Sequence, residues 1–153
     1  MAEFGFGISS KDFGGLLGLT FLFNKNLVGL RENAVVEFRL DNNSESVAGT
    51  DLVFGRKFSA GSFNNFSLAT GISYVHIKQR DENHYNKSTY QYDMIKTNTV
   101  GLPIELKYWN NALWRYLGGS VTLGTNFNPK QSYVNLTLGL MIGNTRESRS
   151  HTR

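Results

Sequence analysis

Val-Gly-Leu-Pro-Ile-Glu-Leu-Lys-Tyr, residues 100–108, alternates two kinds of side chain without a break. Successive side chains of a β-strand point to opposite faces. The even-numbered face of this segment is large and apolar, whereas the odd-numbered face carries Gly101, Pro103, Glu105 and Lys107. One face suits hydrocarbon, and the other is small or charged, which a soluble core does not readily accept. The pattern therefore predicts a strand of a membrane-spanning β-barrel.

Composition favours the same architecture. The 153 residues leave room for one domain of eight strands of about ten residues each, with their turns. The mean hydropathy of −0.31 and the lack of an apolar run of about 20 residues exclude a membrane helix. Sixteen Gly and 13% aromatic residues disfavour helices and suit pleated sheets. With no Cys, disulfides and Cys-ligated zinc are excluded as well.

The net charge of +4 does not predict a nucleic-acid partner, because the basic residues are scattered among acidic ones except at Arg146, Arg149 and Arg153. Lipopolysaccharide phosphates or simple solvation account for this balance equally well. We therefore expect the lipid bilayer as the main partner and no nucleic acid.

The alternation recurs along the chain and predicts an all-β fold, a single antiparallel up-and-down transmembrane β-barrel of about eight strands. The expected strands are residues 3–9, 16–23, 34–41, 51–58, 66–74, 100–108, 117–127 and 134–143. The expected connections are 10–12, 24–33, 41–44, 59–65, 78–96, a tight one beginning at 110–111, and 128–131. Residues 1–144 would form the barrel, and residues 145–153 a polar, disordered tail.

The two faces admit two arrangements. A soluble lipocalin-like carrier would place the large apolar faces inward around a ligand, but its exterior would then be studded with Gly, which weakens an exposed strand. Inside a narrow membrane barrel Gly leaves space for neighbouring side chains, and charges can pair across the lumen. We favour the membrane arrangement and expect a filled, charged lumen. Its ion network would comprise Glu37, Arg39, Asp51, Lys57, Glu105 and Lys107.

Aromatic residues lie at strand ends that belong to one rim when the strands alternate in direction. These are Phe23, Phe58, Phe66 and Tyr108, with Trp109 and Trp114 flanking a turn on the same rim. Such placement is typical of the aromatic girdle at a bilayer interface. The termini then share the girdle end, and the long connection at 78–96 lies at the opposite end.

With these strands placed, the chain resembles the small eight-stranded outer-membrane β-barrels, similar to the OmpA transmembrane domain and OmpX. The strand Leu102–Tyr108 also looks like a pattern met in outer-membrane β-barrel proteins of Bacteroidetes. The resemblance implies location in the bacterial outer membrane. The chain opens without a secretory signal, which we expect to have been removed or replaced, and it ends in charged residues where many such barrels end in an aromatic one.

No catalytic or metal site is expected. A lipid-modifying barrel enzyme, which is the alternative, would need His, Ser and an acidic or amide partner gathered near a rim. His76, Ser73 and Asp81 are near in sequence, but the first two point to opposite faces of their strand. No two His residues share a ligand spacing, and no dinucleotide or phosphate-loop motif occurs, so no cofactor is expected.

The connection at 78–96 is the expected recognition element, because a rigid barrel presents partners with its loops. Its cations and tyrosines suit a protein partner or the phosphates of lipopolysaccharide. The candidate residues are Lys78, Arg80, Tyr85, Lys87, Tyr90, Tyr92 and Lys96. Pro103 cannot donate to a sheet ladder, so we expect a bulge or a locally broken bond there.

Overall fold

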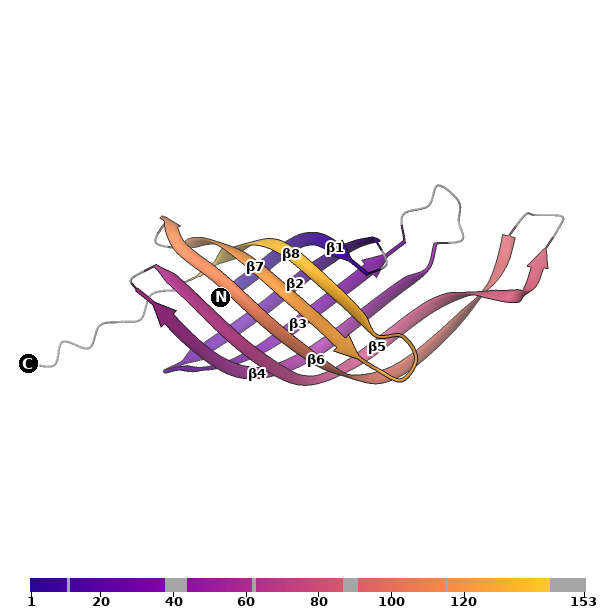
Figure 1. Ribbon diagram of the computed structural model, residues 1–153, viewed down its shortest axis with the longest axis horizontal. Helices are drawn as coiled ribbons and strands as arrows, with labels where there is room; N and C mark the ends of the chain where they lie inside the picture. Colours follow the sequence, from indigo (N-terminus) through magenta and orange to yellow (C-terminus); the bar gives the residue numbers. More distant parts are fainter. Residues whose placement is uncertain (11, 38–43, 62, 87–90, 115, 144–153) are drawn as a thin grey trace, which may run out of the picture.

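Eight antiparallel strands, joined in chain order, close into one barrel in the computed structural model (Figure 1). The structure describes residues 1–10, 12–37, 44–61, 63–86, 91–114 and 116–143. The strands are β1 (Ala2–Ser9), β2 (Asp12–Phe23), β3 (Asn26–Val36), β4 (Ser46–Ala60), β5 (Asn64–Asn86), β6 (Gln91–Trp114), β7 (Leu117–Phe127) and β8 (Tyr133–Ile142). The predicted fold class is confirmed. The expected tail at 145–153 lies outside the described residues.

The ends of the barrel differ in their connections. The turns between β2 and β3, β4 and β5, and β6 and β7 are short and lie at the end where β1 begins, which we call the turn end. Figure 1 shows β5 and β6 running far beyond the other strands at the opposite end, which we call the hairpin end. Within the described ranges, no helix is long and apolar enough to cross a membrane.

The predicted connection at 24–33 is wrong. Only Asn24 and Lys25 separate β2 from β3, and Asn24 adopts a φ of 56°, a conformation that Asn tolerates better than most residues. The rest of the segment is strand, paired with β2 on one side and β4 on the other. The outward Glu32 interrupts the apolar face of β3, so this segment has no continuous apolar alternation in the sequence.

The predicted long loop at 78–96 is also wrong, because most of it is a β-hairpin. Lys78 lies opposite Lys96 and Arg80 opposite Met94 in the β5–β6 ladder. The register shifts between Arg80 and Tyr85, after which Tyr85 lies opposite Tyr92. Beyond Lys78, the described residues of β5 pair with β6 and no longer with β4. A two-stranded extension outside the ring has no barrel interior on one side, so its sequence is not expected to alternate.

Two details of β6 concern its ladders. The predicted tight connection at 110–111 is wrong: β6 continues to Trp114 with an irregularity after Asn110. At Pro103 the ladder to β5 is interrupted without a change of register, and the Thr70 hydroxyl donates to the Pro103 carbonyl at 2.9 Å. The expected broken bond is confirmed, and no bulge forms.

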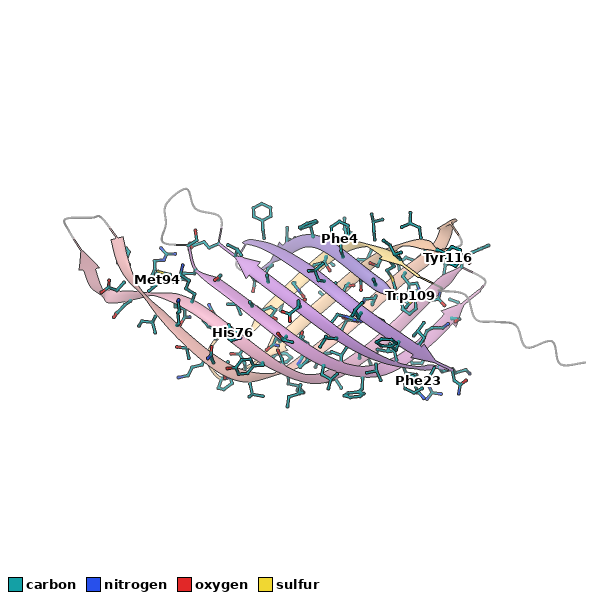
Figure 2. The ribbon with its side chains drawn as sticks, turned by 180° about the vertical axis from the view of Figure 1, so that it is seen from behind. Phe4, Phe23, His76, Met94, Trp109 and Tyr116 are labelled. Carbon is teal, nitrogen blue, oxygen red and sulfur yellow. The ribbon has the colours of Figure 1, made fainter. Side chains whose placement is uncertain are left out.

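The outside of the barrel is covered by exposed apolar side chains (Figure 2). Every strand contributes, with exposed fractions of 46–68%, for example Phe6, Leu17, Leu30, Phe54, Leu68, Leu102, Leu123 and Leu138. We call this surface the apolar belt. Phe23, Phe58 and Phe66 are exposed near its turn end as expected, but Trp109 is only 1% exposed and therefore points into the barrel.

The inside is layered. Near the turn end, Leu27, Val53 and Ala69 form an apolar cluster with Leu22. Toward the hairpin end, a second apolar cluster is formed by Val35, Val47, Val75, Ile77 and Tyr133. Buried charged and polar side chains occupy the rest of the interior. Charged, polar and apolar side chains therefore share the interior of the barrel.

Candidate functional site

An ion pair between Arg31 of β3 and Glu105 of β6 spans the lumen. The Arg31 guanidinium donates from Nε to Glu105 Oε2 at 2.9 Å and from Nη2 to Oε1 at 3.3 Å. Its Nη1 donates to the Leu19 carbonyl at 3.0 Å. These two hydrogen bonds give both carboxylate oxygens of Glu105 a donor. Both side chains need such partners, because Arg31 is only 2% exposed and Glu105 only 7%.

Lys107 and Glu3 extend this pair into a four-residue network. Lys107 Nζ lies 3.2 Å from Glu105 Oε1 and 2.5 Å from Glu3 Oε2. The Ser120 hydroxyl donates to Glu3 Oε1 at 2.8 Å. Two cations and two carboxylates alternate along the network, so its formal charges cancel within the closed interior. We call Glu3, Arg31, Glu105 and Lys107 the lumen network.

Glycine makes the space for Arg31. A Cβ at Gly29 would lie 2.6 Å from Arg31 Nη1, and one at Gly18 would lie 3.0 Å from Arg31 Cδ. Larger residues at these inward positions would push the guanidinium away from Glu105. The expected use of inward Gly as room for neighbouring side chains is thus present at Arg31.

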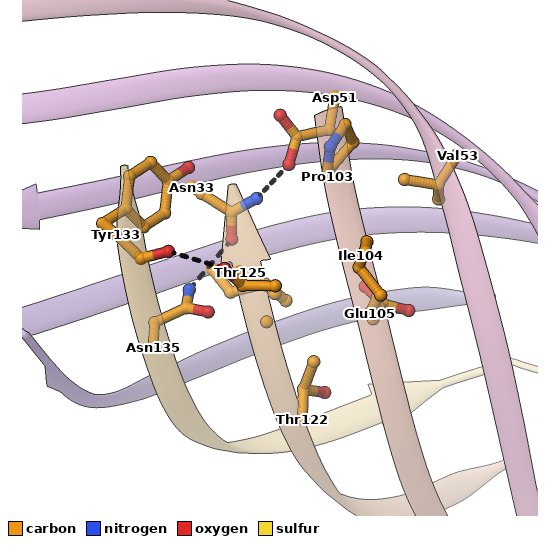
Figure 3. A pocket seen from close by; sticks show the side chains of 12 residues that line it. Asn33, Asp51, Val53, Pro103, Ile104, Glu105, Thr122, Thr125, Tyr133 and Asn135 are labelled. Carbon is orange, nitrogen blue, oxygen red and sulfur yellow. Dashed lines mark hydrogen bonds between the residues drawn. The ribbon is translucent and has the colours of Figure 1, made fainter. Parts of the chain in front are cut away.

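Asp51 belongs to a second polar cluster, nearer the hairpin end (Figure 3). It accepts hydrogen bonds from Asn33 Nδ2 at 2.6 Å and from the Ser73 hydroxyl, and Asn135 Nδ2 donates to Asn33 Oδ1 at 3.4 Å. A cavity of about 20 Å³ lies beside Asp51 and Tyr133. This volume suits about one water molecule, so the cluster is packed and offers no ligand-sized space.

The remaining predicted lumen residues are Lys57, Glu37 and Arg39. Lys57 is 4% exposed and sits on the same inner row as Ser67 and Lys107. Glu37 lies at the hairpin end of the barrel, where it pairs with Arg80. Arg39 lies outside the described residues.

Arg80 fastens the hairpin to the barrel rim. Its Nη2 donates to Glu37, and its Nε lies 3.6 Å from Glu45 Oε1. The Arg80 backbone N–H also donates to Glu45 Oε1 at 3.2 Å, and the Glu37 N–H donates to the Glu45 carbonyl at 3.0 Å. We call Glu37, Glu45 and Arg80 the rim clamp. Arg80 is therefore part of a structural contact at the base of the hairpin.

The other predicted recognition residues follow the hairpin. Lys96 is exposed and Lys78 half-buried, and both lie near its base, opposite each other. Tyr92 is half-buried, and its strand position is opposite Tyr85. Lys87 and Tyr90 lie outside the described residues.

Sequence reasoning missed Arg31 and Glu3. Arg31 fell inside the predicted connection at 24–33, although Leu27, Gly29, Arg31 and Asn33 all share one strand parity and point inward. Glu3 is the first residue of the strand predicted at 3–9 and has no predicted role. It nevertheless has the parity of the inward Gly5 and Gly7. In both cases parity alone was the available signal.

His76 and Ser73 lie on opposite faces of β5, as their parity predicted. His76 is on the outer surface, where Nδ1 lies 2.8 Å from Asn98 Oδ1 and the ring meets Tyr74 edge to face at 4.7 Å. Ser73 is buried inside the barrel, where its hydroxyl donates a hydrogen bond to Asp51. Among the described residues, no group of three potential ligands could hold a metal ion.

Two solved structures have the same architecture. The N-terminal β-barrel domain of Pseudomonas aeruginosa OprF is 12% identical, with a TM-score of 0.62 over 92% of this chain and 93% of that one. Neisserial surface protein A (NspA) is 10% identical, with a TM-score of 0.65 over 92% of each chain. No model of a protein family and no curated protein sequence matches this chain.

The chain therefore has the fold of the small eight-stranded outer-membrane β-barrels. The resemblance to that class expected from the sequence is confirmed for the fold. At these identities the likeness does not extend to a particular activity.

Proposed function

We propose that this protein is an integral outer-membrane β-barrel without enzymatic activity, whose closed barrel anchors a surface hairpin that binds a partner or stabilises the envelope. The observation that carries the proposal is the inversion of inside and outside. Large apolar side chains such as Leu138, 66% exposed, cover the exterior, while Arg31 and Lys107 are buried at 2%. Water would penalise this exterior, whereas lipid solvates it.

The same inversion argues against the soluble carrier. A lipocalin-like carrier needs an apolar cavity large enough for its ligand. Here the interior holds the lumen network, the Asp51 cluster and two apolar clusters. The cavity beside Asp51 is about 20 Å³, which accommodates no lipid-like ligand.

The filled lumen also favours an anchoring role over transport. The Arg31–Glu105 pair crosses the interior, and Val35, Val47 and Val75 fill it nearer the hairpin end. An eight-stranded barrel of this kind has an interior just wide enough for side chains. We expect no ion conductance above background when the protein is inserted into a planar bilayer.

The hairpin is the element best placed to meet a partner. It extends past the barrel (Figure 1) and presents Lys78, Ile95 and Lys96 near its base, with Ile95 48% exposed. Cations beside apolar side chains suit the phosphates and acyl chains of lipopolysaccharide, or an acidic protein surface. The hairpin would then face outward, with the turn end in the periplasm.

Insertion tests the membrane part of the proposal. The purified chain, refolded with phospholipid vesicles, should float with them in a density gradient and show different gel mobility before and after boiling. A chain that stays monodisperse without detergent and fails to float would contradict membrane insertion.

Shortening the hairpin tests the binding part. Replacing residues 81–93 with a short Gly-Ser turn keeps Arg80 and the rim clamp, so heat-modifiable mobility should persist. Binding to lipopolysaccharide or to cells should fall, because Tyr85, Lys87, Tyr90 and Tyr92 are removed, and Lys78 and Lys96 at the base offer less contact area by themselves. The matched control is Lys130→Gln in the β7–β8 connection, which removes one cation at the same end and should leave binding unchanged. Equal binding by the shortened and parent barrels would place recognition elsewhere.

A further inference from the structure

A group of cations lines an open pocket at the turn end, between the β2–β3 turn and the last residues of β4. Lys25, Arg56 and Lys57 surround a space of about 350 Å³, together with Phe58 and Ser59. Among the residues that the structure describes, no acidic side chain lines it. The pocket lies far from the hairpin, at the other end of the barrel.

Backbone contacts hold this pocket in place. The Lys57 N–H donates to the Lys25 carbonyl at 2.7 Å, which ties the β2–β3 turn to β4. Arg56 lies opposite Asn26 in the β3–β4 ladder, one residue beyond that turn. The two exposed cations are therefore fixed on neighbouring elements.

Arg56 lies in an apolar setting. It is exposed on the outer face of β4, between Phe54 at 52% and Phe58 at 53% exposure, and opposite Leu68 of β5 at 54%. Phe54, Phe58 and Leu68 belong to the apolar belt. The guanidinium thus projects from a surface that meets lipid, close to the edge of the belt.

Lys25 and Arg56 form no ion pair with any residue that the structure describes. By contrast, Arg31 and Lys107 are both paired with carboxylates inside the barrel. A cation at the edge of hydrocarbon gains from an anionic partner, since charge attraction is stronger there than in bulk water. The planar fork of Arg matches the oxygens of a phosphate.

We infer that Lys25 and Arg56 bind the phosphate of an anionic phospholipid in the leaflet at the turn end, with the acyl chains lying on Phe54, Phe58 and Leu68. The inference rests on the proposed membrane insertion. It adds a lipid-headgroup site to the periplasmic rim of the barrel, separate from recognition by the hairpin. The apolar surface beside the cations favours a lipid over free phosphate.

Native mass spectrometry of the full chain in detergent tests the site, using phosphatidylglycerol and phosphatidylcholine as probes. The parent should retain phosphatidylglycerol preferentially. Lys25→Gln with Arg56→Gln should lower its affinity for phosphatidylglycerol about tenfold, because charged hydrogen bonds to the phosphate are lost. The control, Lys130→Gln, removes a cation of the β7–β8 connection at the hairpin end and should retain the lipid as the parent does.

Three results would overturn the site. They are equal retention of phosphatidylglycerol by the double variant and the control, no preference of the parent for phosphatidylglycerol, and complete displacement of the lipid by equimolar inorganic phosphate. Arg56→Lys should keep most of the preference, which guards against a folding defect in the Gln variant. Flotation of the same samples separates the two proposals. If the parent floats with vesicles but shows no lipid preference, only the lipid-headgroup site is overturned. If the parent does not float, the proposed membrane insertion is overturned as well.

Discussion

Inward glycines set how closely the wall of the barrel can pack. A Cβ built on Gly71 of β5 would lie 1.9 Å from the Leu52 carbonyl oxygen and 2.8 Å from Val53 Cα, both backbone atoms of β4. Backbone atoms in a closed ladder cannot move aside for an added Cβ, whereas the end of a flexible side chain can. On the outside, by contrast, a Cβ on Gly15 would meet no atom within 4 Å.

Gly71→Ala should therefore destabilise the folded barrel by about 2 kcal/mol or more, as overpacking does. Gly15→Ala should be neutral or stabilise it by about 0.5 kcal/mol, because it restricts the unfolded chain. Urea unfolding in vesicles, followed by Trp fluorescence, measures both. Similar effects of the two substitutions would contradict the close approach at Gly71.

The lumen network predicts strong coupling between Arg31 and Glu105. Glu105→Leu leaves Arg31 and Lys107 with one carboxylate fewer, so it should cost about 3–5 kcal/mol of unfolding free energy. Adding Arg31→Met should recover part of that loss. A double-mutant cycle by chemical denaturation measures the coupling. Strict additivity would show that the pair does not stabilise the barrel as a unit.

Glu32 is the opposite case, an acidic side chain on the apolar belt. It is exposed, it accepts a hydrogen bond from the Thr50 hydroxyl at 2.7 Å, and its neighbour on the same face is Leu30, 47% exposed. Acidic side chains facing lipid are unfavourable. Glu32→Leu should therefore raise stability in vesicles by about 1 kcal/mol. A loss of stability would mean that the carboxylate makes a favourable contact within the membrane.

At the scale of elements, the rim clamp joins the β5–β6 hairpin to the β3–β4 connection. Arg80→Leu removes a cation shared by Glu37 and Glu45. The ends of β3 and β4 should then open more readily, while the lumen network beneath them is unaffected. Hydrogen exchange should accelerate at Glu45 and Val47 by about tenfold, as expected when a charged contact worth about 1.5 kcal/mol is lost. Lys78→Leu serves as the control on the same strand.

The apolar belt also determines the behaviour of the whole molecule. Leu138 of β8 is 66% exposed on the belt, and its neighbour Thr137 is 2% exposed inside the barrel. Leu138→Arg should cost about 2–4 kcal/mol and reduce insertion into vesicles, whereas Thr137→Ser should be nearly silent. Flotation and denaturant titration of both variants measure this. Equal tolerance at the two positions would contradict a lipid-facing exterior.

The sequence alone determined the architecture. Alternation along residues 100–108 and 134–142 assigned each side chain to a face, because strand geometry fixes side-chain direction at a period of two. It correctly placed Glu105 and Lys107 inward and Leu138 outward. The alternation is lost where one residue departs from its face, as Glu32 does on β3. It is also lost where the strands leave the closed ring, as in the hairpin beyond Lys78.

Only the tertiary structure decided which charges meet. Parity shows that Arg31, Glu105 and Glu3 point inward, but their contacts join β3, β6 and β1, which are distant in the chain. Closure of the barrel and the register of each ladder bring these strands to matching depths. The pairing of Arg80 with Glu37, and the position of Lys25 beside Lys57 of β4 at the turn end, depend on that same stagger. Strand periodicity is a local property, whereas the relative depth of residues on different strands is a property of the closed ring.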